Sequence, residues 1–211
     1  MSLPGKWVIF DYGNVVSEEQ SGDDLAALAG EAQVPVAAFR DAYWPRRIDY
    51  DRADLDGWEY WGDVAERLGQ HWDDQRITRL SQLDTASWLH LRPGTVALVE
   101  ELSAAGQPLA LLSNAPVEVA DAVARLPLAR HFRHLVFSCH VKATKPDPDC
   151  YRAALDRIGA QPGDVIFTDD RAENVAGAAR LGMTALPFTA PGTLRASLAA
   201  ALSGSGFQPG R

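Results

Sequence analysis

The sequence predicts a doubly wound α/β fold, in which helices cover both faces of a parallel sheet and an all-helical module follows the first strand. Three observations support this prediction. Five short runs are apolar on both alternating faces, as strands buried on both sides of a parallel sheet are. Helical patterns separate the later four runs, and strands alternating with helices are typical of this class. The long segment between the first two runs shows helical periodicity without a strand pattern.

The apolar runs define the expected strands. They lie at Trp7–Phe10, Leu109–Leu112, Leu135–Phe137, Val165–Thr168 and Thr184–Pro187. A stripe of apolar residues at helical spacing precedes each of the later four strands, which predicts right-handed crossover helices. Three of these stripes stop at Gly106, Gly159 and Gly182, and glycine is the preferred residue just past a helix end.

The segment between the first two strands is too long for one crossover. Its periodicity predicts helices at Asp24–Ala29, Val36–Tyr43, Leu55–Leu68 and Ile77–Leu89. We therefore expect a helical domain at residues 17–92, a core domain at residues 1–16 and 93–202, and a linker-like tail at residues 203–211. Five of the six tryptophans fall in the helical domain, and we interpret them as its core: Trp44, Trp58, Trp61, Trp72 and Trp88.

Composition limits the possible partners and the compartment. The 211-residue chain has a formal net charge of −8, which argues against nucleic acid and anionic membranes as partners. Its two cysteines, Cys139 and Cys150, form neither a disulfide framework nor a zinc pattern, so a reducing cytoplasm is expected. No apolar run approaches the length of a membrane span, and no signal peptide precedes the first strand. We expect a cytoplasmic monomer or homodimer.

Polar residues follow the expected strands where ligands of open α/β sheets bind. Three carboxylates that converge there would repel one another unless they are protonated or hold a cation. Oxygen ligands with open positions suit Mg²⁺, a lysine and a hydroxyl suit phosphate, and a carboxylate can attack phosphorus. This combination predicts metal-assisted phosphoryl transfer. The residues concerned are Asp11, Gly13, Asn14, Ser113, Asn114, Lys145, Asp169 and Asp170.

Four motifs in this order resemble those of the haloacid dehalogenase (HAD) superfamily: "FDYGNVV", "LLSNA", "TKPDPDCY" and "FTDDRAEN". The resemblance covers nearly the whole chain and implies a Rossmann-like HAD core with a C1-type helical cap that selects small substrates. It also implies that Asp11 is the nucleophile and that Ser113, Asn114 and Lys145 bind the transferring phosphoryl group. A small phosphorylated metabolite is the substrate that these roles imply.

The same resemblance implies a Mg²⁺ site. The ion would bind the Asp11 carboxylate, the backbone carbonyl of Gly13 and Asp170, with Asp169 as a direct or water-mediated ligand. In many phosphatases of the superfamily a second aspartate lies two residues after the nucleophile, where this chain has Gly13. That aspartate protonates the leaving group. The "D-x-G-N" pattern instead resembles glucose-1-phosphate phosphatases and the N-terminal domain of epoxide hydrolases. A good leaving group, a metal-bound water or a cap residue would have to replace the missing acid.

Two other functions are compatible with parts of the pattern. A 2-haloacid dehalogenase also lacks the second aspartate, attacks carbon and needs no metal, but paired Asp169 and Asp170 would repel a haloacid carboxylate. The second alternative is a non-catalytic phosphate-binding protein. Such a protein would not need Asp11, Lys145 and the pair of aspartates together.

Structural roles for individual residues are also to be weighed. Aspartates and serines at these positions also close strands and cap helices, and Asn174 is expected to brace the acidic loop. The charged stretch at Arg46, Arg47, Asp49 and Tyr50 is interpreted as a solvated surface. The five histidines form no convincing ligand cluster.

Overall fold

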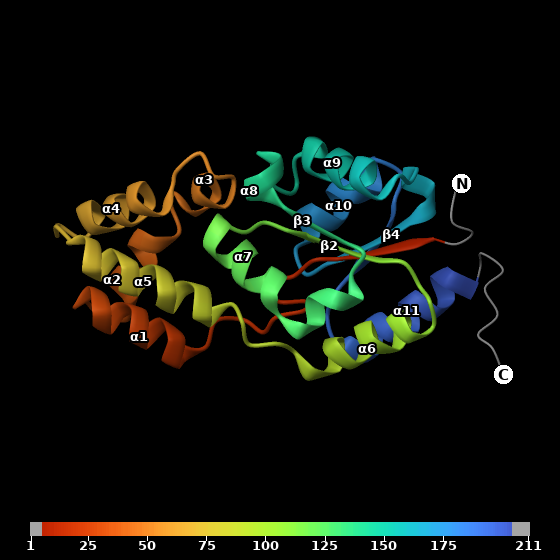
Figure 1. Cartoon of the computed structure of the whole chain (residues 1–211), viewed down its shortest axis with the longest axis horizontal. Coiled ribbons are helices and arrows are strands. Elements are labelled where there is room, and N and C mark those ends of the chain that lie inside the picture. The colour runs from red at the N-terminus through yellow and green to blue at the C-terminus, as the bar shows by residue number, and fades with distance from the viewer. Residues whose placement is uncertain (1–5, 204–211) are drawn as a thin grey trace.

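The computed structural model describes residues 6–203. A parallel sheet with its covering helices forms one end of the molecule, and a bundle of helices forms the other (Figure 1). The described ends of the chain lie together at the sheet end, far from the bundle (Figure 1). Residues 1–5 of the expected core and residues 204–211 of the expected tail lie outside the described part.

The sheet has five parallel strands in the order β3-β2-β1-β4-β5. The strands are β1 (Trp7–Phe10), β2 (Leu109–Ser113), β3 (His134–Phe137), β4 (Val165–Asp169) and β5 (Thr184–Pro187). The chain progresses outward from β1 in one direction through β2 and β3, and in the other through β4 and β5. Because this reversal lies between β1 and β4, the carboxyl ends of these two strands form the place where such sheets bind ligands. The predicted α/β class is confirmed.

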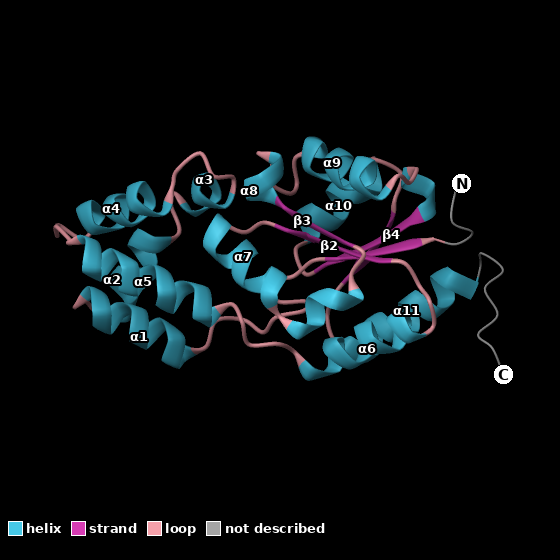
Figure 2. Cartoon of the chain, in the orientation of Figure 1, coloured by secondary structure: helices cyan, strands magenta, loops and turns pink. Residues whose placement is uncertain are grey.

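Both faces of the sheet are buried under helices, as the strand sequences require. Val8 and Phe10 join one apolar cluster, whereas Trp7 and Ile9 join the other. Helices α6 (Pro93–Ala104), α7 (Val117–Arg125) and α11 (Pro191–Ser203) contribute to the first cluster, and α9 (Pro148–Ile158) and α10 (Ala172–Arg180) to the second. Figure 2 shows the strands enclosed between these two layers.

The segment between β1 and α6 is helical. It contains α1 (Gly22–Ala32), α2 (Val36–Tyr43), α3 (Arg47–Asp51), α4 (Gly57–Arg67) and α5 (Asp74–Ser87). These helices enclose a separate apolar cluster that includes Leu28, Phe39, Trp61 and Leu80. The two connections to the sheet lie side by side, because Ser17 and Leu91 form an antiparallel bridge.

The tryptophan interpretation is partly wrong. Trp61 and Trp72 are buried, but Trp44 and Trp58 are 48% and 50% exposed. The buried residues of α4 are Tyr60, Trp61, Val64 and Ala65, and Trp58 lies outside this buried face. Three α-helices are not predicted from the sequence: α3, α11 and the four-residue α8 (Ser138–Val141).

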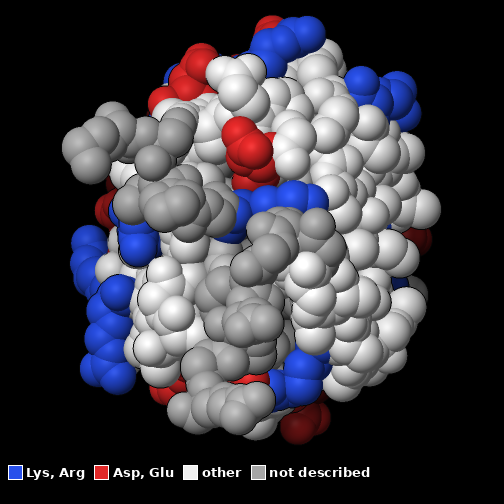
Figure 3. All heavy atoms as spheres, turned by 90° about the vertical axis from the view of Figure 1, so that its right-hand side faces the viewer, with Lys and Arg blue, Asp and Glu red and all other residues white. Residues whose placement is uncertain are grey.

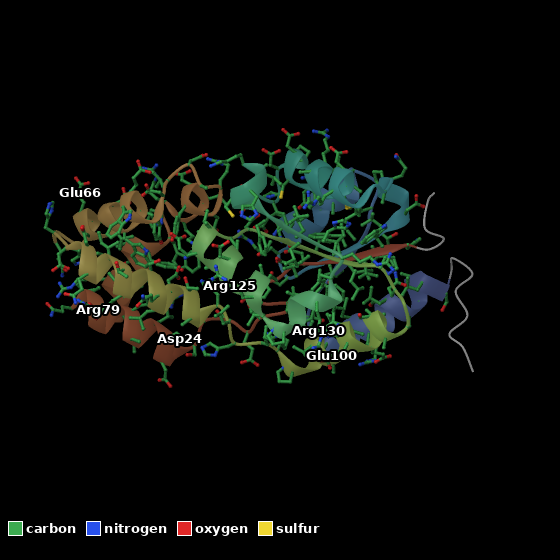
Figure 4. The ribbon with its side chains drawn as sticks, viewed as in Figure 1. Asp24, Glu66, Arg79, Glu100, Arg125 and Arg130 are labelled. Carbon is green, nitrogen blue, oxygen red and sulfur yellow. The ribbon has the colours of Figure 1, made fainter. Side chains whose placement is uncertain are left out.

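Charged side chains occur at both ends of the molecule. Asp24, Glu66 and Arg79 project from the bundle, and Glu100, Arg125 and Arg130 from the sheet end (Figure 4). On the face shown in Figure 3, acidic and basic residues are interspersed on a largely uncharged surface. Among the described residues, no helix has the combined length and apolarity that crossing a bilayer requires.

Candidate active site

Asp11 lies immediately after β1 at the reversal point of the sheet. Its backbone N–H donates to the Thr168 carbonyl of β4 at 2.9 Å, which fixes the residue beside the end of that strand. The side chain is 6% exposed, and its Oδ1 accepts from the Tyr12 backbone N–H and lies 2.6 Å from Lys145 Nζ. Both of these contacts engage Oδ1, which leaves Oδ2 to face a ligand.

Lys145 is the buried cation of the site. Its ammonium contacts Asp11 on one side and Asp169 Oδ2 on the other, at 2.7 Å. The Asn114 side chain holds the backbone of Lys145 with two hydrogen bonds, from Nδ2 to the Lys145 carbonyl at 2.9 Å and from the Lys145 N–H to Oδ1 at 2.8 Å. The Asn114 side chain therefore positions Lys145.

The two acidic residues after Thr168 have different surroundings. Asp169 is the last residue of β4 and is fully buried, accepting hydrogen bonds from Lys145, the Arg171 backbone N–H and Asn174 Nδ2. Asp170 is exposed in the loop and accepts from Asn14 Nδ2 at 3.1 Å. Asp169 is thus a fixed counter-charge for Lys145, whereas Asp170 has the freedom to accept an incoming ligand.

The charges at the site are unbalanced. Burial raises the pKa of Asp11 well above its usual value, while Lys145 opposes the rise and Asp169 adds to it. Burial also raises the pKa of Asp170. The pKa of Lys145 is raised because the attraction of Asp11 and Asp169 outweighs the effect of burial. Asp11 and Asp169 share the Lys145 ammonium, and Asp170 adds a third carboxylate close by, so the carboxylates outnumber the ammonium by two.

The donor set fits a magnesium ion. Asp11, Asp169 and Asp170 each place a carboxylate oxygen within 4.8 Å of the others. Asn14 Oδ1 is a buried acceptor without a protein partner at the same place. Hard oxygen donors and two unbalanced negative charges match the preferences of a small divalent cation.

A cavity joins these residues to the helical bundle. From the sheet end it is lined by Asp11, Gly13, Asn14, Ser113, Asn114, Lys145, Asp170 and Arg171. From the bundle it is lined by Trp44, Arg47, Ile48 and Asp51, together with Trp88 at the end of α5. All the residues expected at the site thus border one cavity, except Asp169, which lies behind Lys145. Ser113 is buried, and among the described residues its hydroxyl makes one long hydrogen bond, 3.4 Å from the Asn114 carbonyl.

Gly13 is not required by space or by backbone conformation. A Cβ built there would meet only the Trp88 ring, at 3.8 Å, which is an ordinary contact. The absence of a carboxylate at this position is therefore a chemical feature of the chain, since the local structure would accept a side chain.

The interpretation of the charged stretch in the bundle as a solvated surface is wrong for two of its residues. Arg47 is 6% exposed and Tyr50 is 2% exposed. Arg47 donates from Nε to Asp51 and from Nη1 to Asp84, and its guanidinium lies over the Tyr43, Tyr50 and Trp88 rings. Arg47 and Asp51 are four residues apart in the sequence, but Asp84, the second carboxylate partner of Arg47, cannot be identified from local spacing.

Asn174 braces Asp169, as expected, and this contact can be tested. Its Nδ2 lies 3.0 Å from both carboxylate oxygens of Asp169 in a buried setting. We expect Asn174→Ala to lower the free energy of unfolding by about 1–3 kcal/mol, because a buried charge loses a donor. Urea unfolding at pH 7 measures this difference. Asn174→Asp should destabilise more, since it places a like charge against Asp169; an alanine variant as stable as wild type would contradict the bracing role.

Comparison with known proteins now identifies the family. The model of the haloacid dehalogenase-like hydrolases matches residues 6–182. The chain belongs to this family. Among individual HAD hydrolases, it is 27% identical over 158 residues to (S)-2-haloacid dehalogenase 4A of Burkholderia cepacia, covering 71% of this chain. It is 30% identical over 120 residues to hexitol phosphatase A of Escherichia coli, covering 54% of this chain.

These matches span 65% of the dehalogenase and 54% of the phosphatase, less than two thirds of either relative. The fold is also shared with a HAD family enzyme of Bacteroides thetaiotaomicron, of which an aspartate-to-alanine mutant was crystallised with magnesium and inorganic phosphate. That structure superimposes with a TM-score of 0.71 at 17% identity, covering 88% of this chain and 95% of the other. The HAD relatives thus include both phosphatases and dehalogenases.

Proposed function

We propose that this HAD hydrolase is a Mg²⁺-dependent phosphatase of a small phosphorylated metabolite, such as a sugar phosphate, that acts through an aspartyl-phosphate on Asp11. The observation that carries the proposal is the group of three carboxylates with oxygens within 4.8 Å of one another, two of which share a single lysine. An anionic phosphate enters such a site only if a cation offsets the charge. The hexitol phosphatase relative and the fold neighbour crystallised with magnesium and phosphate agree with this function.

Each residue of the site has a defined task in this mechanism. Asp11 Oδ2 attacks phosphorus while Lys145 holds Oδ1. The Ser113 hydroxyl, which has no strong partner, donates to a phosphoryl oxygen. Asp169 holds the ammonium of Lys145, and Asn114 holds its backbone. Mg²⁺, held by Asp11, Asp170 and the Gly13 carbonyl, would neutralise the charge that develops on the phosphoryl oxygens.

A dehalogenase is the second candidate, because the Burkholderia relative has that activity and Gly13 carries no acid. Asp170 argues against it, since this exposed carboxylate lines the cavity and would repel the carboxylate of a haloacid. The "D-x-G-N" pattern resembles that of sugar phosphatases, and this resemblance favours the phosphatase.

Chelation separates these functions. With p-nitrophenyl phosphate and sugar phosphates as substrates, we expect EDTA to lower the activity by about 100-fold or more, because the cation contributes several kcal/mol of transition-state stabilisation. Added Mg²⁺ should restore the rate. Activity that survives chelation would sink the proposed mechanism. Release of halide from a 2-haloacid without metal would establish the dehalogenase, and Mg²⁺ binding without turnover of any phosphate would indicate a non-catalytic protein.

A further inference from the structure

The bundle contributes a carboxylate to the cavity that Asp11 borders. Asp51, the last residue of α3, is 9% exposed and borders the same cavity as Asp11, Ser113 and Lys145. Its Oδ1 accepts from Arg47 Nε at 2.8 Å, and within the described chain no hydrogen bond engages Oδ2. The cavity thus holds, besides Asp11 and Asp170, a third carboxyl group, which has a free oxygen and comes from the bundle.

Asp51 is fixed relative to the phosphate-binding side of the site. Helix α3 lies beside α8 (Figure 1), and the Ser138 hydroxyl at the start of α8 donates to the Asp51 backbone carbonyl. The same hydroxyl accepts from the Ala115 backbone N–H at 2.9 Å. Because Ala115 directly follows Ser113 and Asn114, one serine connects the Asp51 backbone to the loop after β2.

The buried charges around Asp51 favour its neutral form. Arg47 is shared between two carboxylates, and Asp84 is the better satisfied of them: Nη1 donates to both of its oxygens and the Tyr43 hydroxyl donates to one. Asp51 receives one hydrogen bond from the guanidinium. Two ionised carboxylates beside one arginine would leave a net negative charge in a buried place, so a proton is best accommodated on Asp51.

The other groups around Asp51 shift its pKa in both directions. Burial raises the pKa of Asp51, Arg47 opposes this rise, Asp84 adds to it, and Arg171 lowers it. Tyr60 of α4 and Cys139 of α8 also interact with Asp51, and burial raises the pKa of both, which keeps them neutral. Asp84 comes from α5 and Arg171 from the cap position of α10, so every charged neighbour but Arg47 lies on another element.

We infer that Asp51 is the proton donor for the leaving group, in the role for which Gly13 provides no side chain. This inference rests on the proposed phosphatase function. As the bond from Asp11 to phosphorus forms and the bond from phosphorus to the leaving oxygen breaks, the Asp51 proton passes to that oxygen. In the second step the Asp51 carboxylate accepts a proton from the attacking water, which releases inorganic phosphate and regenerates both aspartates.

The test compares Asp51→Asn with Asp84→Asn on a series of substituted phenyl phosphates. Both changes remove a carboxylate from Arg47, but only Asp51 borders the cavity. We expect the wild-type rate to depend weakly on the leaving group. Asp51→Asn should lose less than about tenfold on p-nitrophenyl phosphate and about 10²-fold or more on phenyl phosphate, the range of general acid catalysis. Asp84→Asn should keep the weak dependence.

A rescue variant gives an independent readout. Because Gly13 has room for a Cβ, Gly13→Asp in the Asp51→Asn background should restore part of the phenyl phosphate activity. A uniform loss on all substrates, or the same selective loss in Asp84→Asn, would overturn the inference. If Asp51→Asn does not fold, the wild-type enzyme decides alone: a weak dependence on the leaving group supports a protein acid, and a steep one overturns it. A wild-type protein without phosphatase activity would instead reject the proposed function itself.

Discussion

Asp11→Asn is expected to lower kcat/KM for p-nitrophenyl phosphate with Mg²⁺ by at least about 10³-fold. The amide keeps the shape of the side chain but is neither a nucleophile nor a good metal ligand, so the step that forms the aspartyl-phosphate is lost. Steady-state kinetics measure the rate, and acid trapping of labelled protein tests directly for a phosphoryl group on the wild type.

Stability should respond differently from activity in this variant. Burial raises the pKa of Asp11, which means that its ionised form is costly to bury. The Asp11→Asn change removes that charge, while Lys145 keeps Asp169 as its partner. We therefore expect unfolding in urea to be unchanged or to require more denaturant. Asp121→Asn, on the exposed surface of α7, is the matched control and should keep full activity. An Asp11→Asn variant that turns over phosphate esters would exclude Asp11 as the nucleophile.

The strands could be predicted closely from the sequence, because burial on both faces imposes continuous apolar runs. The differences lie at polar strand ends. Ser113 pairs with Phe137 and Asp169 pairs with Pro187, so both belong to their strands although their side chains read as loop residues. This register is what separates the two adjacent aspartates: Asp169 ends inside the sheet, and Asp170 is the first residue beyond it. The two adjacent aspartates in the sequence do not indicate which of them is buried.

The site residues that the sheet contributes could be predicted because each of them lies at or after the carboxyl end of a predicted strand. The bundle side could not, because its burial depends on contacts between distant segments. Arg47 lies in a strongly charged stretch, and charged stretches usually face solvent. It is buried here because Asp84, 37 residues away, and a ring of aromatic side chains satisfy its charge. Neither partner can be assigned from local spacing.

Lys145→Met is expected to lower the free energy of unfolding by about 3–5 kcal/mol in the absence of Mg²⁺. Lys145 is the shared partner of two buried carboxylates, and removing one side of a buried ion pair leaves uncompensated charge. Urea unfolding in EDTA measures the loss. The double variant Lys145→Met with Asp169→Asn is the control: it removes one of the unpaired charges and should recover part of the stability.

The pH and metal dependence of this variant follow from the same charges. Burial already raises the pKa of Asp11 in the wild type, and the loss of the opposing ammonium raises it further. A carboxyl group with a higher pKa in the folded state holds its proton more tightly there, so the variant's deficit should shrink as the pH falls and grow as the pH rises through that pKa. Added Mg²⁺ should also reduce the deficit at pH 7, since it binds the folded state and supplies the missing positive charge. A deficit that responds to neither pH nor Mg²⁺ would show that Lys145 does not stabilise the fold by balancing the charges of Asp11 and Asp169.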